Sequence, residues 1–127
     1  MAAPGLTLDT GALIALERRD RRMLAVLTAA HQDDLTVTVP APVFVEWSRG
    51  KPKRVNAVVD AVTIEPLTAW LARIAGDALV GLPECVSVVD AVVMASAAQR
   101  GDYVYTSDIP DLQSLQGVFP AVRLFKV

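Results

Sequence analysis

The sequence has little sulfur and little imidazole. Among its 127 residues are one cysteine, Cys85, and one histidine, His31. A single cysteine cannot form a disulfide within the chain, so we expect a reducing compartment, the cytoplasm. With one ligand of each kind, a zinc site built from thiolates and imidazoles is excluded.

Long hydrophobic runs are also missing. The longest apolar stretch, residues 86–98, contains Asp90 and two serines and is too short to span a bilayer. The first five residues carry no basic side chain, which makes them a poor signal peptide. We therefore expect no membrane partner.

Charge of one sign is not in excess. Twelve basic and fourteen acidic residues give a net charge of −2 and a pI near 5.2. Overall charge thus gives no indication of nucleic-acid binding, and any such surface must be local. Apolar residues make up 53% of the chain, enough for one buried core, and we expect a single domain over residues 1–127.

Short β-branched runs alternate with stretches of helical periodicity. The expected strands are 6–8, 35–39, 62–64, 103–106 and 122–125. The expected helices are 10–17, 21–30, 42–49, 54–61, one capped by Thr68 and running to 79, one capped by Ser87 and ended by Gly101, and a short one through Leu115. This alternation predicts an α/β fold with a small, mostly parallel central sheet flanked by helices. Packing is the expected role of Trp47, Trp70 and Cys85.

Four carboxylates stand in apolar surroundings. Asp9 follows the first strand, Glu46 lies between Val45 and Trp47, Asp90 lies within a valine-rich helix, and Asp108 follows the strand that ends at Thr106. The remaining acids considered are expected to be ordinary solvated charges or turn formers: Glu17, Asp20, Asp33, Asp34, Asp60, Asp77 and Asp102.

The four carboxylates would meet if the strands before Asp9 and Asp108 are neighbours, because ligands of open α/β sheets bind beyond the carboxyl ends of the strands. Converging carboxylates repel one another, and a divalent cation removes that repulsion. Oxygen ligands without histidine or cysteine favour Mg²⁺ or Mn²⁺, which typically serve phosphoryl chemistry.

Each acid also has a local interpretation, which the sequence leaves open. Asp9 and Asp90 are suitable helix N-caps, and Asp108 opens an Asp-Ile-Pro-Asp turn. Glu46 could face solvent on a short helix.

Four segments containing these acids resemble the PIN-domain family, and most of all its VapC-type ribonuclease toxins. They are residues 8–15 (LDTGALIA), 45–50 (VEWSRG), 89–95 (VDAVVMA) and 104–108 (VYTSD), and the resemblance covers nearly the whole chain. It implies a metal-dependent endoribonuclease in which Asp9, Glu46, Asp90 and Asp108 bind Mg²⁺ or Mn²⁺ and carry out catalysis. Asp111 competes with Asp108 for the fourth acidic position or adds to it, and the Thr10 and Ser107 hydroxyls would support the acids or hold water.

The resemblance further implies attack by water on an RNA phosphodiester, leaving a 5′-phosphate and a 3′-hydroxyl. Phosphate contacts need local positive charge. A cluster after Glu46 is the favoured RNA-binding segment, and it contains Arg49, Lys51, Lys53 and Arg54. A second cluster is formed by Arg18, Arg19, Arg21 and Arg22. A solvated linker is the competing interpretation of both clusters.

A partner is implied too. Toxins of this family are held inactive by a cognate antitoxin, whose C-terminal segment fills a groove near the active site. A candidate groove wall is the apolar face of the first two helices, and ordinary core packing is the competing interpretation: Leu13, Leu16, Met23 and Leu27. Homodimers are common in the family.

Three further functions fit parts of the pattern. Asp9-Thr10-Gly11-Ala12 is also the signature of aspartic proteases, which have two such aspartates on a mostly β fold. A phosphoacceptor receiver domain would fit the strand-end aspartates, with Lys126 as its lysine. A PIN fold without catalysis could act as a binding module only.

Overall fold

The computed structural model describes residues 4–127. Five strands, β1 (Leu6–Leu8), β2 (Val37–Pro40), β3 (Thr63–Glu65), β4 (Tyr103–Thr106) and β5 (Leu124–Lys126), form one sheet in the order β3-β2-β1-β4-β5. Every strand pair is parallel. This confirms the expected single α/β sheet, and the sheet is wholly rather than mostly parallel.

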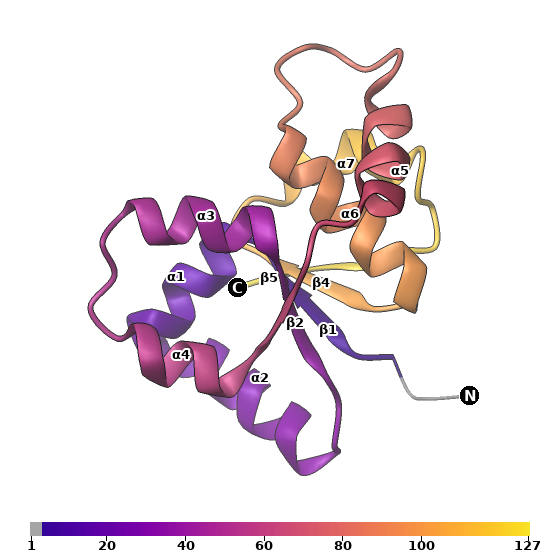
Figure 1. Ribbon diagram of the computed structural model, residues 1–127. Coiled ribbons are helices and arrows are strands. Elements are labelled where there is room, and N and C mark those ends of the chain that lie inside the picture. Colours follow the sequence, from indigo (N-terminus) through magenta and orange to yellow (C-terminus); the bar gives the residue numbers. More distant parts are fainter. Residues whose placement is uncertain (1–3) are drawn as a thin grey trace.

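Seven helices connect the strands within the described residues. They are α1 (Thr10–Glu17), α2 (Arg21–Gln32), α3 (Ala41–Arg49), α4 (Val55–Ala61), α5 (Ala69–Leu79), α6 (Val88–Arg100) and α7 (Ile109–Gln116). Figure 1 shows α5, α6 and α7 gathered on one side of the sheet, and α1, α2 and α4 on the other. None of these helices is long and apolar enough to cross a membrane.

Local signals set several helix ends as expected. The Thr68 hydroxyl accepts from the Leu71 N–H at 3.1 Å, and the Ser87 hydroxyl accepts from the N–H groups of Val89 and Asp90. Gly101 ends α6 in the left-handed conformation, with φ of 73°, which glycine adopts without a steric penalty.

Three strands begin later than expected, because turns and helix ends take up the residues before them. The expected strand 35–39 begins only at Val37, because the Leu35 N–H donates to the Ala30 carbonyl at 2.8 Å and closes the end of α2. The strand expected over 122–125 becomes Leu124–Lys126, since the Val122 N–H donates to Phe119 in a turn. β3 is likewise shifted by one residue from the expected 62–64, because Val62 caps the end of α4.

The apolar faces of α1 and α2 are part of the hydrophobic core. All four residues considered as a groove wall are buried in it: Leu13, Leu16, Met23 and Leu27. The groove interpretation is therefore wrong for this face, because its side chains already pack inside the domain. Trp47 is buried as expected, whereas Trp70 is 69% exposed and Cys85 is exposed.

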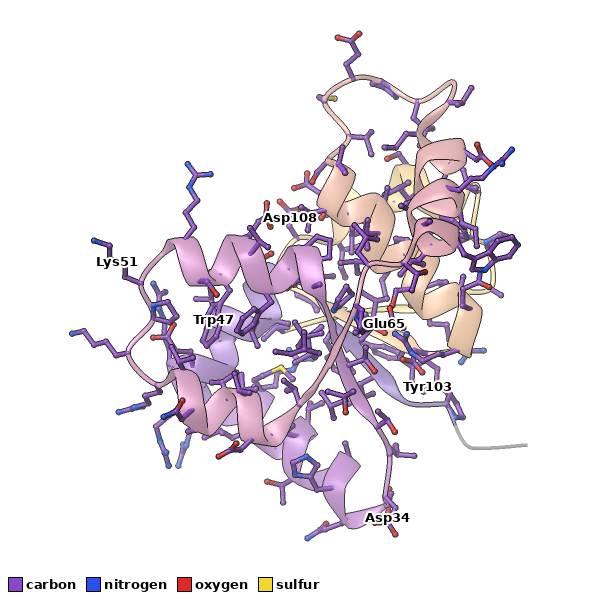
Figure 2. All side chains as sticks on the ribbon, in the orientation of Figure 1. Asp34, Trp47, Lys51, Glu65, Tyr103 and Asp108 are labelled. Carbon is purple, nitrogen blue, oxygen red and sulfur yellow. The ribbon has the colours of Figure 1, made fainter. Side chains whose placement is uncertain are left out.

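A polar network joins β1, β3 and α6 beside the core. Arg100 bonds to Glu65 and, through Nε at 2.9 Å, to Asp102. Asp102 also accepts from the Gly5 N–H at 3.0 Å and from the Thr7 hydroxyl at 2.9 Å. Figure 2 marks Glu65 in this region. Asp102 was expected to be an ordinary solvated or turn charge, and that expectation is wrong, since it is buried and fully partnered.

Candidate active site

Asp9 and Asp108 follow two neighbouring strands. β1 pairs with β4 in parallel register, so the carboxyl ends of both strands lie at one edge of the sheet. Asp9 comes directly after β1, and its N–H donates to the Tyr105 carbonyl on β4 at 3.2 Å. The Asp108 N–H donates to the Thr106 hydroxyl at 2.9 Å. From the sequence alone, we expect the four carboxylates to meet if these two strands are neighbours, and the strands are neighbours.

Asp9 is both a helix cap and a member of this group. Its Oδ1 accepts from the Ala12 N–H at 2.8 Å, which satisfies one of the free N–H groups of α1. The residue is only 8% exposed. The capping interpretation of Asp9 is thus confirmed, and the cap fixes a buried carboxylate at the end of β1.

Asp108 occupies the N-cap position of α7, but its side chain makes no capping bond. Asp111 lies in the first turn of the same helix. Side-chain hydrogen bonding with Asp108 and the negative charge of Asp108 raise the pKa of Asp111 above its usual value. The two acids that compete for the fourth position therefore lie side by side.

Glu46 lies on the exposed side of α3, across from the start of α1. The Thr10 hydroxyl donates to Glu46 Oε1 at 2.5 Å. Glu46 is exposed, so the prediction that it faces solvent is correct. Its carboxylate is nevertheless bound to Thr10, the residue that follows Asp9. Thr10 therefore does contact one of the four acids.

Asp90 lies in the first turn of α6 and is not its cap, because Ser87 fills that position. Burial is the largest cause that raises the pKa of Asp90 to about 6. The negative charges of Asp9, Asp111, Glu46 and Asp108 contribute to the same rise, in that order of effect. The pKa of Asp90 is thus affected by the charge of each of the other four candidate acids.

Asp9 is also shifted, for a similar reason. Burial raises its pKa, hydrogen bonds from the Thr106 hydroxyl and from the N–H groups of Ala12 and Gly11 oppose the shift, and the charge of Asp108 adds to it. Burial is the largest cause of both pKa shifts, and neighbouring negative charge adds to each.

Ser107 packs against the first turn of α1. A Cβ added to Gly11 would lie 1.8 Å from the Ser107 Oγ, so only glycine lets the loop after β4 come this close. The observed contact of Ser107 is therefore with the α1 backbone, and this contact draws the segment before Asp108 towards Asp9.

The donor set of the site consists of oxygen alone: Asp9, Glu46, Asp90, Asp108 and Asp111. Among residues 4–127, no three histidine, cysteine, aspartate or glutamate side chains are arranged to coordinate one ion. The ligand chemistry nevertheless fits Mg²⁺ or Mn²⁺, because hard carboxylate oxygens in mutual repulsion are what such ions bind and neutralise.

The basic cluster after α3 is exposed. Arg49, Lys51, Lys53 and Arg54 all lie on the surface, and none of them forms an ion pair within the part of the chain that is described. Figure 2 shows Lys51 on the outer loop between α3 and α4. The segment is anchored by Glu17, which accepts from the Trp47 indole N–H at 3.3 Å and, at 3.5 Å, from the Lys53 N–H. Glu17 thus positions the basic segment. The sequence around Glu17 gave no indication of this role.

Sequence reasoning also missed a pocket beside Asp90 and Asp111, formed with the loop before α6. Its residues are distant in the chain and carry no shared motif.

Comparison with solved structures places the fold among toxin–antitoxin complexes. A chain of VapBC2 from Rickettsia felis, bound to a promoter DNA fragment, matches with a TM-score of 0.77 at 13% identity, covering 96% of this chain and 98% of that one. DNA-bound VapBC from Salmonella typhimurium gives 0.76 at 15% identity, with 98% of both chains covered. A toxin–antitoxin complex from Klebsiella pneumoniae gives 0.69 at 15%, covering 97% and 100%.

No family model and no curated protein matches the sequence. At such low identity, the structural matches establish the fold. They confirm the fold that the resemblance of the four motifs implied.

Proposed function

We propose that the chain is a metal-dependent endoribonuclease and the toxin of a toxin–antitoxin pair. The observation that carries this proposal is the grouping of five carboxylates near the carboxyl ends of β1 and β4. The negative charges of the other four contribute to the raised pKa of Asp90. No ion pair neutralises any of them within residues 4–127. The fold shared with components of toxin–antitoxin complexes supports the biological role.

Asp9, Glu46, Asp90 and Asp108, with Asp111 beside Asp108, would hold Mg²⁺ or Mn²⁺. When bound, such an ion makes water a better nucleophile and stabilises negative charge on the phosphate oxygens. The cap of α1 holds Asp9 in place, and Thr10 orients Glu46. One carboxylate accepts the proton of the attacking water. Arg49, Lys51, Lys53 and Arg54 would bind flanking phosphates, which steers the RNA backbone to the acids.

The test is cleavage of single-stranded RNA with Mg²⁺, Mn²⁺ or EDTA. We expect cleavage with either ion and none in EDTA. Asp9→Asn should lower the rate about a hundredfold, the scale on which one electrostatic contact acts at an active site. Asp77→Asn, at an exposed position on α5, is the matched control and should cleave normally. Products that RNA ligase joins without prior phosphorylation would identify 5′-phosphate and 3′-hydroxyl ends.

Absence of cleavage by the wild type under all these conditions would favour the binding-module interpretation. The fold argues against both a receiver domain and an aspartic protease. The order β3-β2-β1-β4-β5 differs from the 2-1-3-4-5 order of receiver-type sheets. An aspartic protease needs a mostly β fold, whereas residues 4–127 contain seven helices.

The antitoxin would need an apolar surface close to the acids, and one exists beside Glu46. A groove of about 340 Å³ is lined by Pro42, Val45, Leu67 and Val89, and Val45 is 67% exposed. A segment with apolar side chains would bury them here and could place a basic side chain by the carboxylates.

Val45→Glu should weaken the complex with the antitoxin. Val80→Glu, at an 80% exposed valine outside the groove, should leave it intact. The measurement is the dissociation constant of the purified pair. Equal affinity of both variants would place the partner elsewhere, and a second copy of the chain in the groove would be detected by sedimentation of the toxin alone.

A further inference from the structure

A pocket of about 270 Å³ lies beside the carboxylate group, between the loop before α6 and the start of α7. Its apolar walls are Pro83, Val86 and Pro110. Figure 1 shows this loop, which joins α5 to α6, extending beyond the helices at one end of the molecule. The volume is just below the usual range for small-molecule sites, about 300–1,000 Å³, so the pocket suits one ring system rather than a length of chain.

The pocket is continuous with the candidate active site. Asp90 and Asp111 line it, and both belong to the group of five carboxylates. A molecule whose phosphate lies at the acids could therefore place an adjacent group in the pocket.

The polar groups of the pocket are mainly hydrogen-bond acceptors. They include the Asp90 and Asp111 carboxylates and the Ser114 hydroxyl, and no lysine or arginine is among its lining residues. The N–H groups of Val89 and Asp90 at the start of α6 are already bonded to the Ser87 hydroxyl. Inside the pocket itself a phosphate would find no cationic side chain, whereas a neutral ring with N–H donors would find acceptors.

We propose that this pocket binds a nucleobase with an exocyclic amino group, next to the phosphodiester that is cleaved. Proline and valine side chains enclose the ring, and the acceptors receive the amino hydrogens. Uracil fits less well, because its one ring N–H lies between two carbonyl oxygens that the carboxylates repel. Ser114 is then a specificity-determining residue. This inference rests on the proposed ribonuclease function and adds the substrate class of the site.

Cys85 offers a direct readout, because it is exposed, lines the pocket and is the sole cysteine. The experiment measures alkylation of Cys85 by N-ethylmaleimide with mass spectrometry, in the presence of the hexanucleotides rC6 or rU6. Ca²⁺ is supplied as an oxygen-binding cation, and the oligonucleotides are checked to remain intact. Cytosine and uracil are similar in size and differ in the amino group, so the pair isolates that group. Cys85→Ser gives the labelling blank.

We expect rC6 to slow alkylation about tenfold relative to rU6, the discrimination expected from a hydrogen-bonded base contact. Ser114→Trp, which fills the pocket, should abolish this protection. Gln113→Trp adds the same bulk at the neighbouring exposed position, outside the pocket, and should retain it. Equal protection by rC6 and rU6 would overturn the preference for an amino group. No protection by either would overturn the pocket as a base site.

Cleavage provides an independent check. Wild-type cleavage sites should be enriched in bases with amino groups at one fixed position beside the cut, and Ser114→Trp should lose that enrichment. If RNA is cleaved but Cys85 is not protected, the pocket does not bind a base, and the proposed nuclease function still holds. Protection of Cys85 without cleavage in Mg²⁺ or Mn²⁺ would overturn the nuclease function and leave base binding standing.

Discussion

Asp90 shows how one residue can report on the whole site. Its pKa is raised to about 6 first by burial and then by the charges of its acidic neighbours. Since the usual value is 3.8, the folded state holds this proton more tightly than the unfolded chain does. Stability contributed by the protonated form is therefore lost as pH rises from about 4 through about 6.

Asp90→Asn should remove this loss. In EDTA at pH 7 we expect the variant to be more stable than the wild type by about 1 kcal/mol, after allowance for solvent screening of a half-exposed group. At a pH well below 3.8 the difference should disappear, because the aspartate is then protonated in both states. Urea unfolding at about pH 3 and at pH 7 makes the comparison, with Asp60→Asn on the exposed side of α4 as control. A variant less stable than the wild type at pH 7 would contradict the repulsion described here.

At the scale of elements, the sheet and α6 are joined by buried polar contacts as well as by the core. Asp102, directly before β4, accepts from Gly5, Thr7 and Arg100, and Arg100 reaches on to Glu65 in β3. This network therefore connects three elements, β1, β3 and α6, that are distant in the chain.

Asp102→Ala should destabilise the fold by about 3 kcal/mol. The substitution leaves the Arg100 Nε–H, the Gly5 N–H and the Thr7 hydroxyl without this acceptor, which costs more than the bonds themselves contribute. Thermal and urea unfolding measure the loss. The exposed Asp77→Ala is the matched control and should change stability by less than about 0.5 kcal/mol. A loss of similar size in both variants would mean that the network adds little to stability.

At the scale of the whole molecule, a metal ion that binds only the folded chain must stabilise it. At a hundred times its dissociation constant the gain is about 2.7 kcal/mol, which raises the melting temperature of a domain of this size by several degrees. We expect Mn²⁺ or Mg²⁺ to raise the midpoint of the wild type relative to EDTA.

Asp9→Asn should lose most of this thermal shift, and Asp77→Asn should keep it. The same shift in all three proteins would indicate that the ions bind elsewhere. A wild type that no ion stabilises at millimolar concentration would argue against metal binding by the free protein, and the RNA cleavage assay would then decide whether RNA is needed to complete the site.

The sequence by itself determined the class of fold and the candidate acids. Periodicity of apolar residues and local caps such as Thr68, Ser87 and Gly101 act within a few residues of the chain, so they can be recognised without the fold. The strands 6–8 and 103–106 and the placement of Asp9 and Asp108 after them followed from the same local signals.

Only the tertiary structure decided which residues meet. The pairing of β1 with β4 brings Asp9 to Asp108, and helix packing brings Thr10 to Glu46 and Asp90 within range of the remaining acids. Burial of Asp102 and Leu13, exposure of Trp70, and the pocket beside Asp111 depend on contacts between distant segments. Such contacts leave no periodic pattern in the chain, because the partners of each residue lie tens of positions away.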